Sequence, residues 1–363
     1  MKKLYFNPYK GVDWQNYNHY KSNLHTHTTE SDGSLYGADV IDNYKSADYD
    51  ILILADHDSF RPSRSPRELG GVTFINVWDW TIFEGEEEYQ ADVGSYTRLL
   101  EETENQAVSG VANNNMLCFE GCEYSNIHHI GSFDNKFPGM SGNTVDNALN
   151  EDYLRGSLSM FYHPGRYSYS PQWYADFYLK YPNLIGLEVF NQGDRYPNDR
   201  QKCDEINNIT MPYRPVFYYS NDDMHTSSHL FRNFNTILMP DLNRTEFYKA
   251  LKKGASFAHY QPNGSGSFEV PKVNNIIINE EESTIEIIAE NFDAIQWIEN
   301  NTVIATGEIF DFKNTQFNKY IRARLLNSNG ETLVQPFSFL NIDIDVPEPE
   351  PTTKLSSIRP SIR

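Results

Sequence analysis

Short apolar runs of strand length recur along the N-terminal part of the chain and end in polar side chains. A continuous apolar run predicts a strand that is buried on both faces, as in a parallel sheet covered by helices. The predicted strands lie at 50–55, 116–122, 128–133, 158–162, 184–191 and 215–220. Helices are predicted over 38–47, 92–107 and 247–254, the last ending at Gly254. The pattern therefore predicts an α/β domain over 1–265, with an irregular lead-in over 1–22.

The pattern changes beyond 261–267, a segment rich in glycine and serine that we interpret as a linker. Closely spaced strands are predicted at 275–279, 284–289, 295–299, 308–312, 320–326 and 332–339. Asn329 and Gly330 are predicted to form a hairpin turn. We expect a small, Ig-like all-β sandwich over 270–345 and a disordered tail over 346–363.

The segment 59–91 is too long for a standard connection in a compact domain. It combines arginines with Trp78, Trp80 and the acidic stretch from Glu84 to Glu88. Two interpretations stay open for it, a partial cover over a binding site and a surface hairpin.

The motif Asn23-Leu-His25-Thr-His27 pairs two histidines at the end of an apparent strand. Residues two apart in a strand point to the same side, so these imidazoles can face one ion. Gly33 permits a tight turn that brings Asp32 back toward the same point. From this motif alone, an exposed strand face is an equally good interpretation.

Histidine and carboxylate side chains also follow later predicted strands, where α/β folds place their chemistry. A single histidine is more often a satisfied polar residue than a ligand, but that reading does not explain so many at one topological position. The candidate metal ligands are His25, His27, Asp32, His57, Glu123, His129, His163, Asp223 and His225. Nine ligands are too many for one four-coordinate ion and predict two or three divalent metal ions. Imidazole and carboxylate suit zinc, manganese or iron without choosing among them.

The formal net charge of −20 restricts the partners. It argues against duplex nucleic acid and a processive nuclease, because phosphate backbones need clustered Lys and Arg. A small anionic, phosphorylated substrate is compatible with it, because bound divalent metals invert the local charge of an acidic site. Three cysteines are too few for a disulfide framework, and no segment reaches the length of a membrane span. We therefore expect a cytoplasmic protein with no membrane partner.

Taken together, these motifs resemble the PHP (polymerase and histidinol phosphatase) family. The matching motifs are His25-x-His27 with Asp32, the strand ending in Asp56-His57, Gly-Cys-Glu123, His163-Pro164 and Asp223-x-His225, all in family order. The resemblance covers about residues 20 to 260. It implies a distorted seven-stranded β/α barrel, similar to a TIM barrel, with a trinuclear metal centre at its carboxyl-terminal mouth. Segments around Glu188, Tyr320 and Gln335 are similar to a branch of metal-dependent phosphoesterases with a C-terminal β domain.

The resemblance also implies how the ligands divide among the ions. One ion would be shared by His25, His27, Glu123 and Asp223, a second bound by Glu123, His129 and His163, and a third by His57 and His225 with Asp32. The doubled His128-His129 departs from the motif, which needs one ligand. We assign His129 because a predicted strand follows it directly, and expect a structural or proton-shuttling role for His128.

The leading functional hypothesis is hydrolysis of a small phosphomonoester or phosphodiester by a metal-bridging hydroxide. Arg166 is the candidate catalytic residue, because its planar guanidinium can bind a phosphate oxygen; a surface salt bridge is the alternative. Asp56, Asp58 and Asp222 flank candidate ligands and are expected to orient imidazoles. Two other functions stay open. One is hydrolysis of a carboxylic ester, amide or carbamate, and the other is a non-catalytic, metal-stabilised module whose β domain contacts other proteins.

Overall fold

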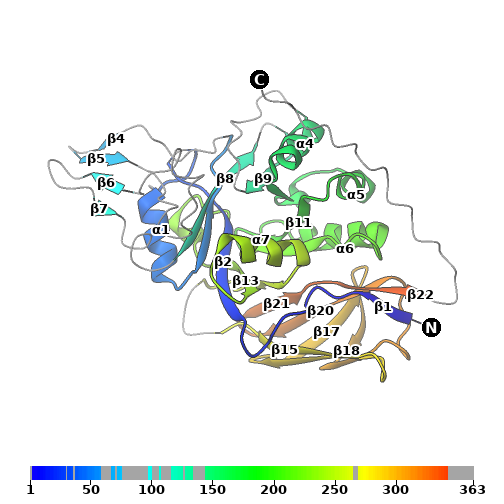
Figure 1. The fold of residues 1–363 in the computed structure, drawn as a ribbon. Helices are drawn as coiled ribbons and strands as arrows, with labels where there is room; N and C mark the ends of the chain where they lie inside the picture. Colours follow the sequence, from blue (N-terminus) through cyan, green and yellow to red (C-terminus); the bar gives the residue numbers. More distant parts are fainter. Residues whose placement is uncertain are drawn as a thin grey trace.

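The computed structural model describes residues 2–29, 31–35, 37–58, 67–69, 72–75, 97–99, 106–107, 116–125, 127–133, 144–264 and 269–341. Within these ranges the chain is a mixed α/β structure with one long curled sheet and two smaller sheets (Figure 1).

The long sheet joins strands from both ends of the chain. In sheet order its strands are β1 (Lys2–Phe6), β22 (Phe337–Asn341), β20 (Tyr320–Asn327), β21 (Gly330–Val334), β14 (Ser256–Tyr260), β13 (Asn233–Met239), β2 (Asn18–Thr26), β3 (Ile51–Leu54), β8 (Leu117–Tyr124), β9 (Ile130–Phe133), β10 (Leu158–Phe161), β11 (Leu184–Asn191) and β12 (Phe217–Asn221). Strand β17 (Ala294–Glu299) pairs with β20 and with β18 (Thr302–Thr306).

The run from β2 to β12 is mostly parallel and deeply buried. Strands β2, β3 and β8 are parallel, β9 is antiparallel to both neighbours, and β10, β11 and β12 are parallel again. Every residue of β3, β10, β11 and β12 is buried. The prediction of strands covered on both faces is thereby confirmed.

The sheet curls so that its parallel run returns to its starting strand. Thr26 at the end of β2 forms a parallel bridge with Met224, just after β12. The backbone N–H of His27 donates to the Met224 carbonyl at 2.9 Å, and the N–H of Leu24 donates to Asn221 Oδ1 at 2.9 Å. The carboxyl ends of β2 and β12 therefore lie side by side, although the chain separates them by almost two hundred residues.

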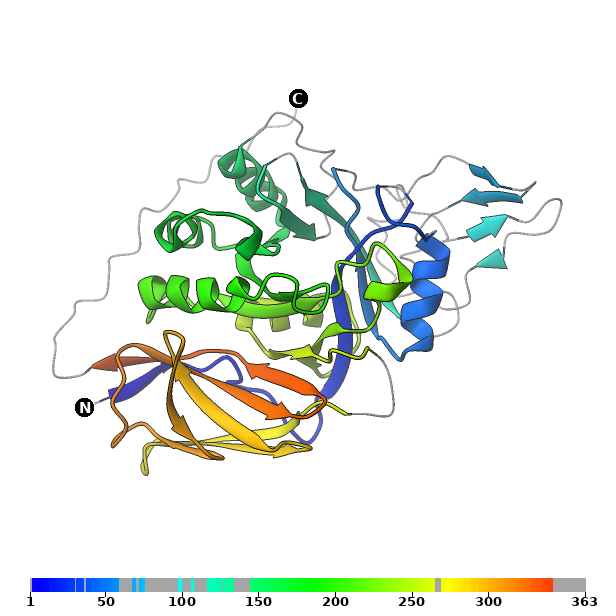
Figure 2. The same ribbon diagram turned by 180° about the vertical axis from the view of Figure 1, so that it is seen from behind.

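Helices flank this curled sheet. They are α1 (Gly37–Ser46), α4 (Val145–Arg155), α5 (Pro171–Lys180), α6 (Asn198–Thr210) and α7 (Arg244–Lys253), with 3-10 turns η2 (Pro164–Arg166) and η3 (Ser227–His229). Figures 1 and 2 show α1 on one side of the parallel strands and α4, α5 and α6 stacked on the other. Gly254 ends α7 with a φ of 73°, as predicted. Among the described residues, none of the helices combines the length and the apolar character needed to cross a bilayer.

The C-terminal region is all β and packs against the strands of the N-terminal region. A separate three-stranded sheet is formed by β15 (Lys272–Asn279), β16 (Thr284–Glu290) and β19 (Ile309–Asp311). Trp297 of β17 and Phe310 of β19 lie in the core of the C-terminal region, with ring centroids 5.0 Å apart. Strand β21 pairs antiparallel with β14, so the long sheet continues across the predicted linker. The division into domains at 1–265 and 270–345 stays a prediction.

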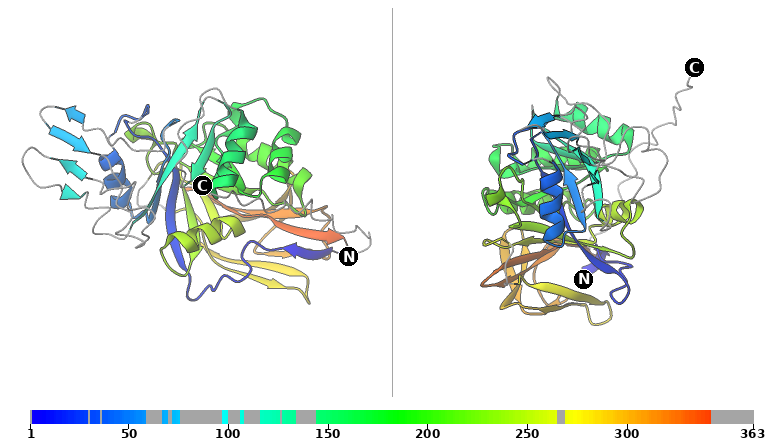
Figure 3. Two further views of the ribbon diagram at one scale, coloured as in Figure 1. Left: turned by 45° about the horizontal axis from the view of Figure 1, so that its top comes forward. Right: turned by 90° about the vertical axis from the view of Figure 1, so that its left-hand side faces the viewer.

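Two predictions near the chain ends need correction. The lead-in over 1–22 is not irregular throughout, because β1 pairs antiparallel with β22 and β2 already begins at Asn18 (Figure 3). The single strand predicted over 332–339 is two strands, β21 and β22. Pro336 lies between them and has no N–H to donate to a ladder. Strand β18 was not predicted.

The helix predicted over 92–107 is wrong for its described residues. Thr97–Leu99 (β6) and Gln106–Ala107 (β7) are strands, and they form a small antiparallel sheet with Arg67–Leu69 (β4) and Val72–Ile75 (β5). Short segments are ambiguous between helix and strand by periodicity alone, and here the pairing partner decides. Most of the segment 59–91, with its proposed covering role, and the tail 346–363 lie outside the described residues.

Candidate metal centre

Four buried side chains from distant parts of the chain meet at the carboxyl ends of the strands. His25 and His27 come from the end of β2, Glu123 from β8 and Asp223 from the loop after β12. Each has at most 5% of its surface exposed. The ends of β2 and β12 lie side by side, which brings Asp223 next to the two histidines. No spacing in the sequence specifies this contact.

The donor atoms of these four residues form a cage of uniform size. His25 Nε2 and His27 Nε2 are 3.1 Å apart. His25 Nε2 lies 3.4 Å from Glu123 Oε2 and 3.2 Å from Asp223 Oδ1, and His27 Nε2 lies 3.3 Å and 3.0 Å from the same oxygens. Ligand atoms about 2.1 Å from one metal ion are about 3.0 Å apart in an octahedron and about 3.4 Å apart in a tetrahedron. The cage therefore has the dimensions of a metal coordination shell.

The second oxygen of Glu123 faces another pair of histidines. Glu123 Oε1 lies 2.5 Å from His129 Nδ1 and 3.2 Å from His163 Nε2. His57 Nδ1 lies 3.0 Å from Glu123 Oε2. Glu123 thus stands between two groups of donors, as a bridging carboxylate does.

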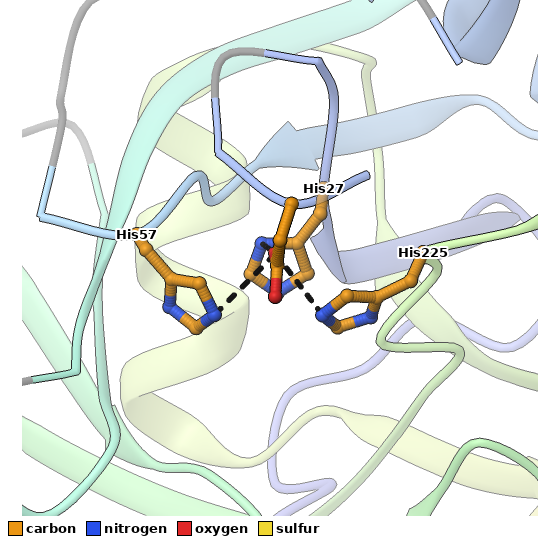
Figure 4. A group of neighbouring side chains, drawn as sticks. His27, His57 and His225 are labelled. Carbon is orange, nitrogen blue, oxygen red and sulfur yellow. Dashed lines mark ion pairs between the residues drawn. The ribbon is translucent and has the colours of Figure 1, made fainter. Parts of the chain in front are cut away.

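A third group surrounds Asp32. Its Oδ1 lies 3.2 Å from His225 Nε2, 3.5 Å from His57 Nε2 and 3.8 Å from His27 Nδ1. Figure 4 shows the imidazoles of His27, His57 and His225 converging on a common point. His57 could share a metal ion with this group, and it could also share one with Glu123 and His129. The family resemblance implied only the site with Asp32 and His225. All nine candidate ligands therefore lie in one connected cluster, with one side chain, Asp32, more than half exposed.

Several buried atoms in the cluster have no hydrogen-bond partner, although they lie close to other donors and acceptors. Among the described residues these include His57 Nδ1, Glu123 Oε2, His129 Nδ1 and Asp223 Oδ1. Buried polar atoms are nearly always paired, because an unpaired one loses its hydration without compensation. Bound cations would satisfy these lone pairs, so the donor set fits divalent metal ions.

Electrostatics in the metal-free cluster point the same way. Burial lowers the pKa of His27, but the adjacent carboxylates of Asp223 and Glu123 overcome this effect and raise the pKa to about 10. Burial raises the pKa of Asp223, but the positive charge of His25 outweighs it and holds the pKa well below its usual range. The carboxylates therefore stay ionised and require positive charge, as protons or as metal ions.

Glu188 on β11 holds His25 from behind, and its role was not predicted. Glu188 Oε1 accepts from His25 Nδ1 at 2.8 Å and from Asn221 Nδ2 at 2.9 Å. Its Oε2 accepts from the backbone N–H of His163 and from Asn191 Nδ2, both at 2.9 Å. A carboxylate behind an imidazole fixes the tautomer and the ring orientation of a ligand. The available signal was a carboxylate within an otherwise apolar, fully buried strand.

The three aspartates expected to orient imidazoles mainly hold loops. Asp56 accepts from the N–H and Oγ1 of Thr28 and from Ser31 Oγ, which in turn lies 3.2 Å from His27 Nδ1. Asp58 accepts from Ser125. Asp222 accepts from Tyr44 and from three consecutive backbone N–H groups beginning at residue 231. Only Asp56 reaches an imidazole along these contacts, through Ser31.

His128 and His129 face different surroundings. Both ring nitrogens of His128 are hydrogen-bonded, Nδ1 to the His129 carbonyl at 2.9 Å and Nε2 to the Tyr174 hydroxyl at 2.7 Å. Burial lowers the pKa of His128 well below its usual range, so its ring is neutral. The ring of His129 instead points to Glu123, and the backbone N–H of His129 donates to the Tyr167 hydroxyl at 3.1 Å.

Seven of the nine candidate ligands line a cavity of about 710 Å³, and His25 and His27 are buried behind them. The cavity lining includes Arg166, the candidate catalytic residue, and residues that were not predicted. The unpredicted lining residues are Ser125, Gln192, Arg195, Tyr196 and His229. All of them are polar, and they lie shortly after strands β8, β11 and β12, in loops where sequence distance from a strand was the only signal.

Three residues that line this cavity, and Asp58 after β3, have left-handed backbone conformations. His163, Gln192 and Asp223 have φ values of 28°, 45° and 45°, and Asp58 has 48°. Such conformations are costly for residues other than glycine and persist where the surroundings hold them, often at functional sites.

No protein-family model matches the sequence, and no curated protein matches it. The chain is similar to a solved two-domain protein from Bacteroides vulgatus that contains a predicted PHP-like metal-dependent phosphoesterase. The two are 14% identical over 93% of this chain and 90% of that chain, with a TM-score of 0.48. It also matches an amidohydrolase from Chromobacterium violaceum, solved with bound sulfate and no metal. That match has 14% identity over 57% of this chain and 88% of that one, with a TM-score of 0.30.

Proposed function

We propose that this chain is a metal-dependent hydrolase that cleaves a small phosphomonoester or phosphodiester. One observation carries the proposal. Five distances between donor atoms of His25, His27, Glu123 and Asp223, all between 3.0 and 3.4 Å, outline a metal-sized cage whose two carboxylates also line a polar cavity. Divalent ions supply charge neutralisation for a phosphoryl group and a hydroxide nucleophile near neutral pH.

The proposed ligands are the nine residues predicted from the sequence. Eight of them fall into three donor groups that fit two or three divalent ions, and His163 lies 3.2 Å from Glu123 Oε1. Zinc, manganese and iron all suit imidazole and carboxylate donors. We further propose that β2, β3 and β8 to β12 form the seven-stranded barrel implied by the resemblance, with the C-terminal β strands as a sandwich domain. The Thr26–Met224 bridge supports closure of that barrel.

The two arginines in the cavity lining favour an anion. Arg166 and Arg195 both line the cavity, and guanidinium groups bind phosphate oxygens through two parallel hydrogen bonds. The polar lining favours a small polar substrate over an apolar one. The proposed partner is therefore a small phosphorylated molecule. Contact with other proteins through the C-terminal strands β15 to β22, the β region, stays a proposal without a specific surface.

The experiment compares substrate classes on one metal-loaded preparation. Phosphate or phenol release is measured with p-nitrophenyl phosphate, bis-p-nitrophenyl phosphate, sugar phosphates and nucleotides, beside aryl esters and anilides. We expect turnover of phosphoesters, loss of that turnover in Glu123→Gln, and normal turnover in the control Glu281→Gln, which makes the same change at an exposed turn.

The opposite pattern of activities would reject the phosphoesterase assignment. Turnover of esters or amides alone would favour carbonyl hydrolysis, which is the alternative predicted from the sequence. A metal-loaded chain that turns over none of these substrates would favour the non-catalytic module.

A further inference from the structure

We propose that Gln192 is a positioning residue that holds Asp223 so that only its Oδ1 atom faces the metal cluster. The inference rests on the proposed metal site and deepens it, because it assigns Asp223 as a ligand through one oxygen. Gln192 is not among the nine candidate ligands.

The side-chain amide of Gln192 donates hydrogen bonds to two oxygens of Asp223. Gln192 Nε2 donates to the Asp223 carbonyl oxygen at 3.0 Å and to Asp223 Oδ2 at 3.1 Å. The other carboxylate oxygen, Oδ1, lies 3.2 Å from His25 Nε2 and 3.0 Å from His27 Nε2 and has no hydrogen-bond partner. One oxygen of Asp223 is thus held by the amide, and the other is presented to the cluster.

The orientation of this amide is fixed by a neighbouring arginine. Arg195 Nη1 donates to Gln192 Oε1 at 2.5 Å. A guanidinium has only donors, so the oxygen of the amide must face Arg195 and its NH₂ must face Asp223. The two hydrogens of that NH₂ face the two acceptors of Asp223, and the same nitrogen also lies 3.2 Å from His225 Nδ1.

The same contacts settle the tautomer of a further candidate ligand. His225 Nδ1 lies 2.8 Å from the Asp223 carbonyl oxygen and donates to it. The proton of a neutral His225 is therefore on Nδ1, and Nε2 is free to face Asp32 at 3.2 Å. Gln192 and His225 share the Asp223 carbonyl, which has two lone pairs.

The backbone at Gln192 is strained, and the loop does not need this side chain to keep its position. Gln192 has a φ of 45°, a conformation that favours glycine. The next residue, Gly193, is held independently, because its N–H donates to Asn233 Oδ1 at 2.5 Å and its carbonyl accepts from Asn233 Nδ2 at 2.9 Å. A glutamine at a strained, separately anchored position is explained if its amide has a task.

The test measures Mn²⁺ binding by electron paramagnetic resonance in the full-length chain. The variants are Gln192→Leu, which removes the amide, and Gln192→Gly, which also relieves the left-handed strain. Gln172→Leu is the control, because Gln172 is an exposed glutamine of α5 that does not line the cavity. Melting temperatures are measured on each protein before Mn²⁺ is added.

We expect both Gln192 variants to bind Mn²⁺ about 10-fold to 100-fold more weakly than the wild type, the range for loss of a group that orients a ligand. The spectrum of the remaining bound Mn²⁺ should change, because Oδ2 is then free to approach the ion. Gln192→Gly should melt no lower than Gln192→Leu, which separates positioning from folding. Gln172→Leu should match the wild type throughout.

Wild-type Mn²⁺ affinity and an unchanged spectrum in both Gln192 variants would overturn the inference and leave the proposed function standing. A wild-type chain that binds no Mn²⁺ would instead overturn the proposed metal site. Because the readout is metal binding, the result does not depend on which substrate the enzyme cleaves.

Discussion

Glu188 Oε1 and His25 Nδ1 are joined by a hydrogen bond of 2.8 Å in the fully buried interior. A carboxylate accepts this bond, so Nδ1 of His25 keeps its proton, and Nε2 is the nitrogen that a metal ion can bind once it displaces the second proton. The Glu188 carboxylate accepts hydrogen bonds from four donors. Glu188→Gln replaces one of its oxygens with an NH₂ group, which is itself a donor. We expect metal affinity to fall about 10-fold to 100-fold, measured as competition with a chelator of known affinity.

The control for this substitution is Glu282→Gln, which makes the same change at an exposed residue. Its metal affinity and melting temperature should equal those of the wild type. If Glu188→Gln also keeps wild-type metal affinity, Glu188 has no role in presenting His25.

The raised pKa of His27 predicts how the metal-free chain responds to alkali. Its pKa is about 10 in the folded chain and 6.5 without the fold. The proton on His27 therefore stabilises the metal-free fold fully below pH 6.5, and this stabilisation is lost as the pH rises toward 10. We expect the melting temperature in EDTA to fall between pH 7 and pH 10, and metal affinity to rise over the same interval because binding displaces the proton.

Other groups also titrate near pH 10, so the comparison is made with His27→Gln. That variant should lose less stability between pH 7 and pH 10 than the wild type. Equal losses in the two proteins would show that His27 is not protonated in the metal-free cluster.

Arg166 is predicted to bind the substrate at the cavity wall. Arg166→Ala removes charge-assisted hydrogen bonds, each contributing about 1.5–3 kcal/mol. We expect KM for a phosphoester to rise at least about 10-fold and inhibition by inorganic phosphate to weaken by a similar factor. Arg155→Ala, at an exposed residue of α4, is the matched control and should leave both constants unchanged. An unchanged KM in Arg166→Ala would place Arg166 outside the substrate site.

The β region is predicted to be necessary for the fold of the N-terminal region. Arg322 on β20 forms a buried, two-pronged ion pair with Asp204 on α6, with distances of 2.8 and 2.7 Å. Gln335 reaches β12, where it accepts from the N–H of Tyr218 and donates to its carbonyl, both at 2.8 Å. Removing one partner of a buried ion pair costs about 3–5 kcal/mol, and we expect Arg322→Leu to lower the free energy of unfolding by about that amount.

Urea denaturation measures this loss. Lys272→Met breaks an exposed ion pair in the same region and should leave the free energy of unfolding unchanged. A chain ending at residue 264 should fail to give a cooperative unfolding transition, because β14 loses β21 as its neighbour. A truncated chain that folds cooperatively would show that the β region is an accessory.

Parts of this structure were accessible from the sequence because they follow local rules. The buried strands show as apolar runs, the end of α7 shows as Gly254, and the convergence of His25 with His27 follows from the period of a strand. The candidate ligands were found because histidines and carboxylates share one position at the ends of strands.

The remaining features depend on contacts between distant segments. Nothing near Lys2 indicates that it begins a strand paired with β22, and nothing near Glu188 states that His25 lies against it. The orientation of Gln192 requires Arg195 on one side and Asp223 on the other, an arrangement made only when β11 and β12 lie together. Gln192 and Arg195, in the loop after β11, therefore escaped prediction, although β11 itself was predicted.

The most direct test of the central claim is the metal content per chain, measured by elemental analysis on protein purified without chelator and reconstituted with manganese or zinc. The account predicts two or three tightly bound ions per wild-type chain, and fewer after substitution of Glu123, the carboxylate that faces two donor groups. A wild-type chain that retains no ion, or a single one, would contradict it.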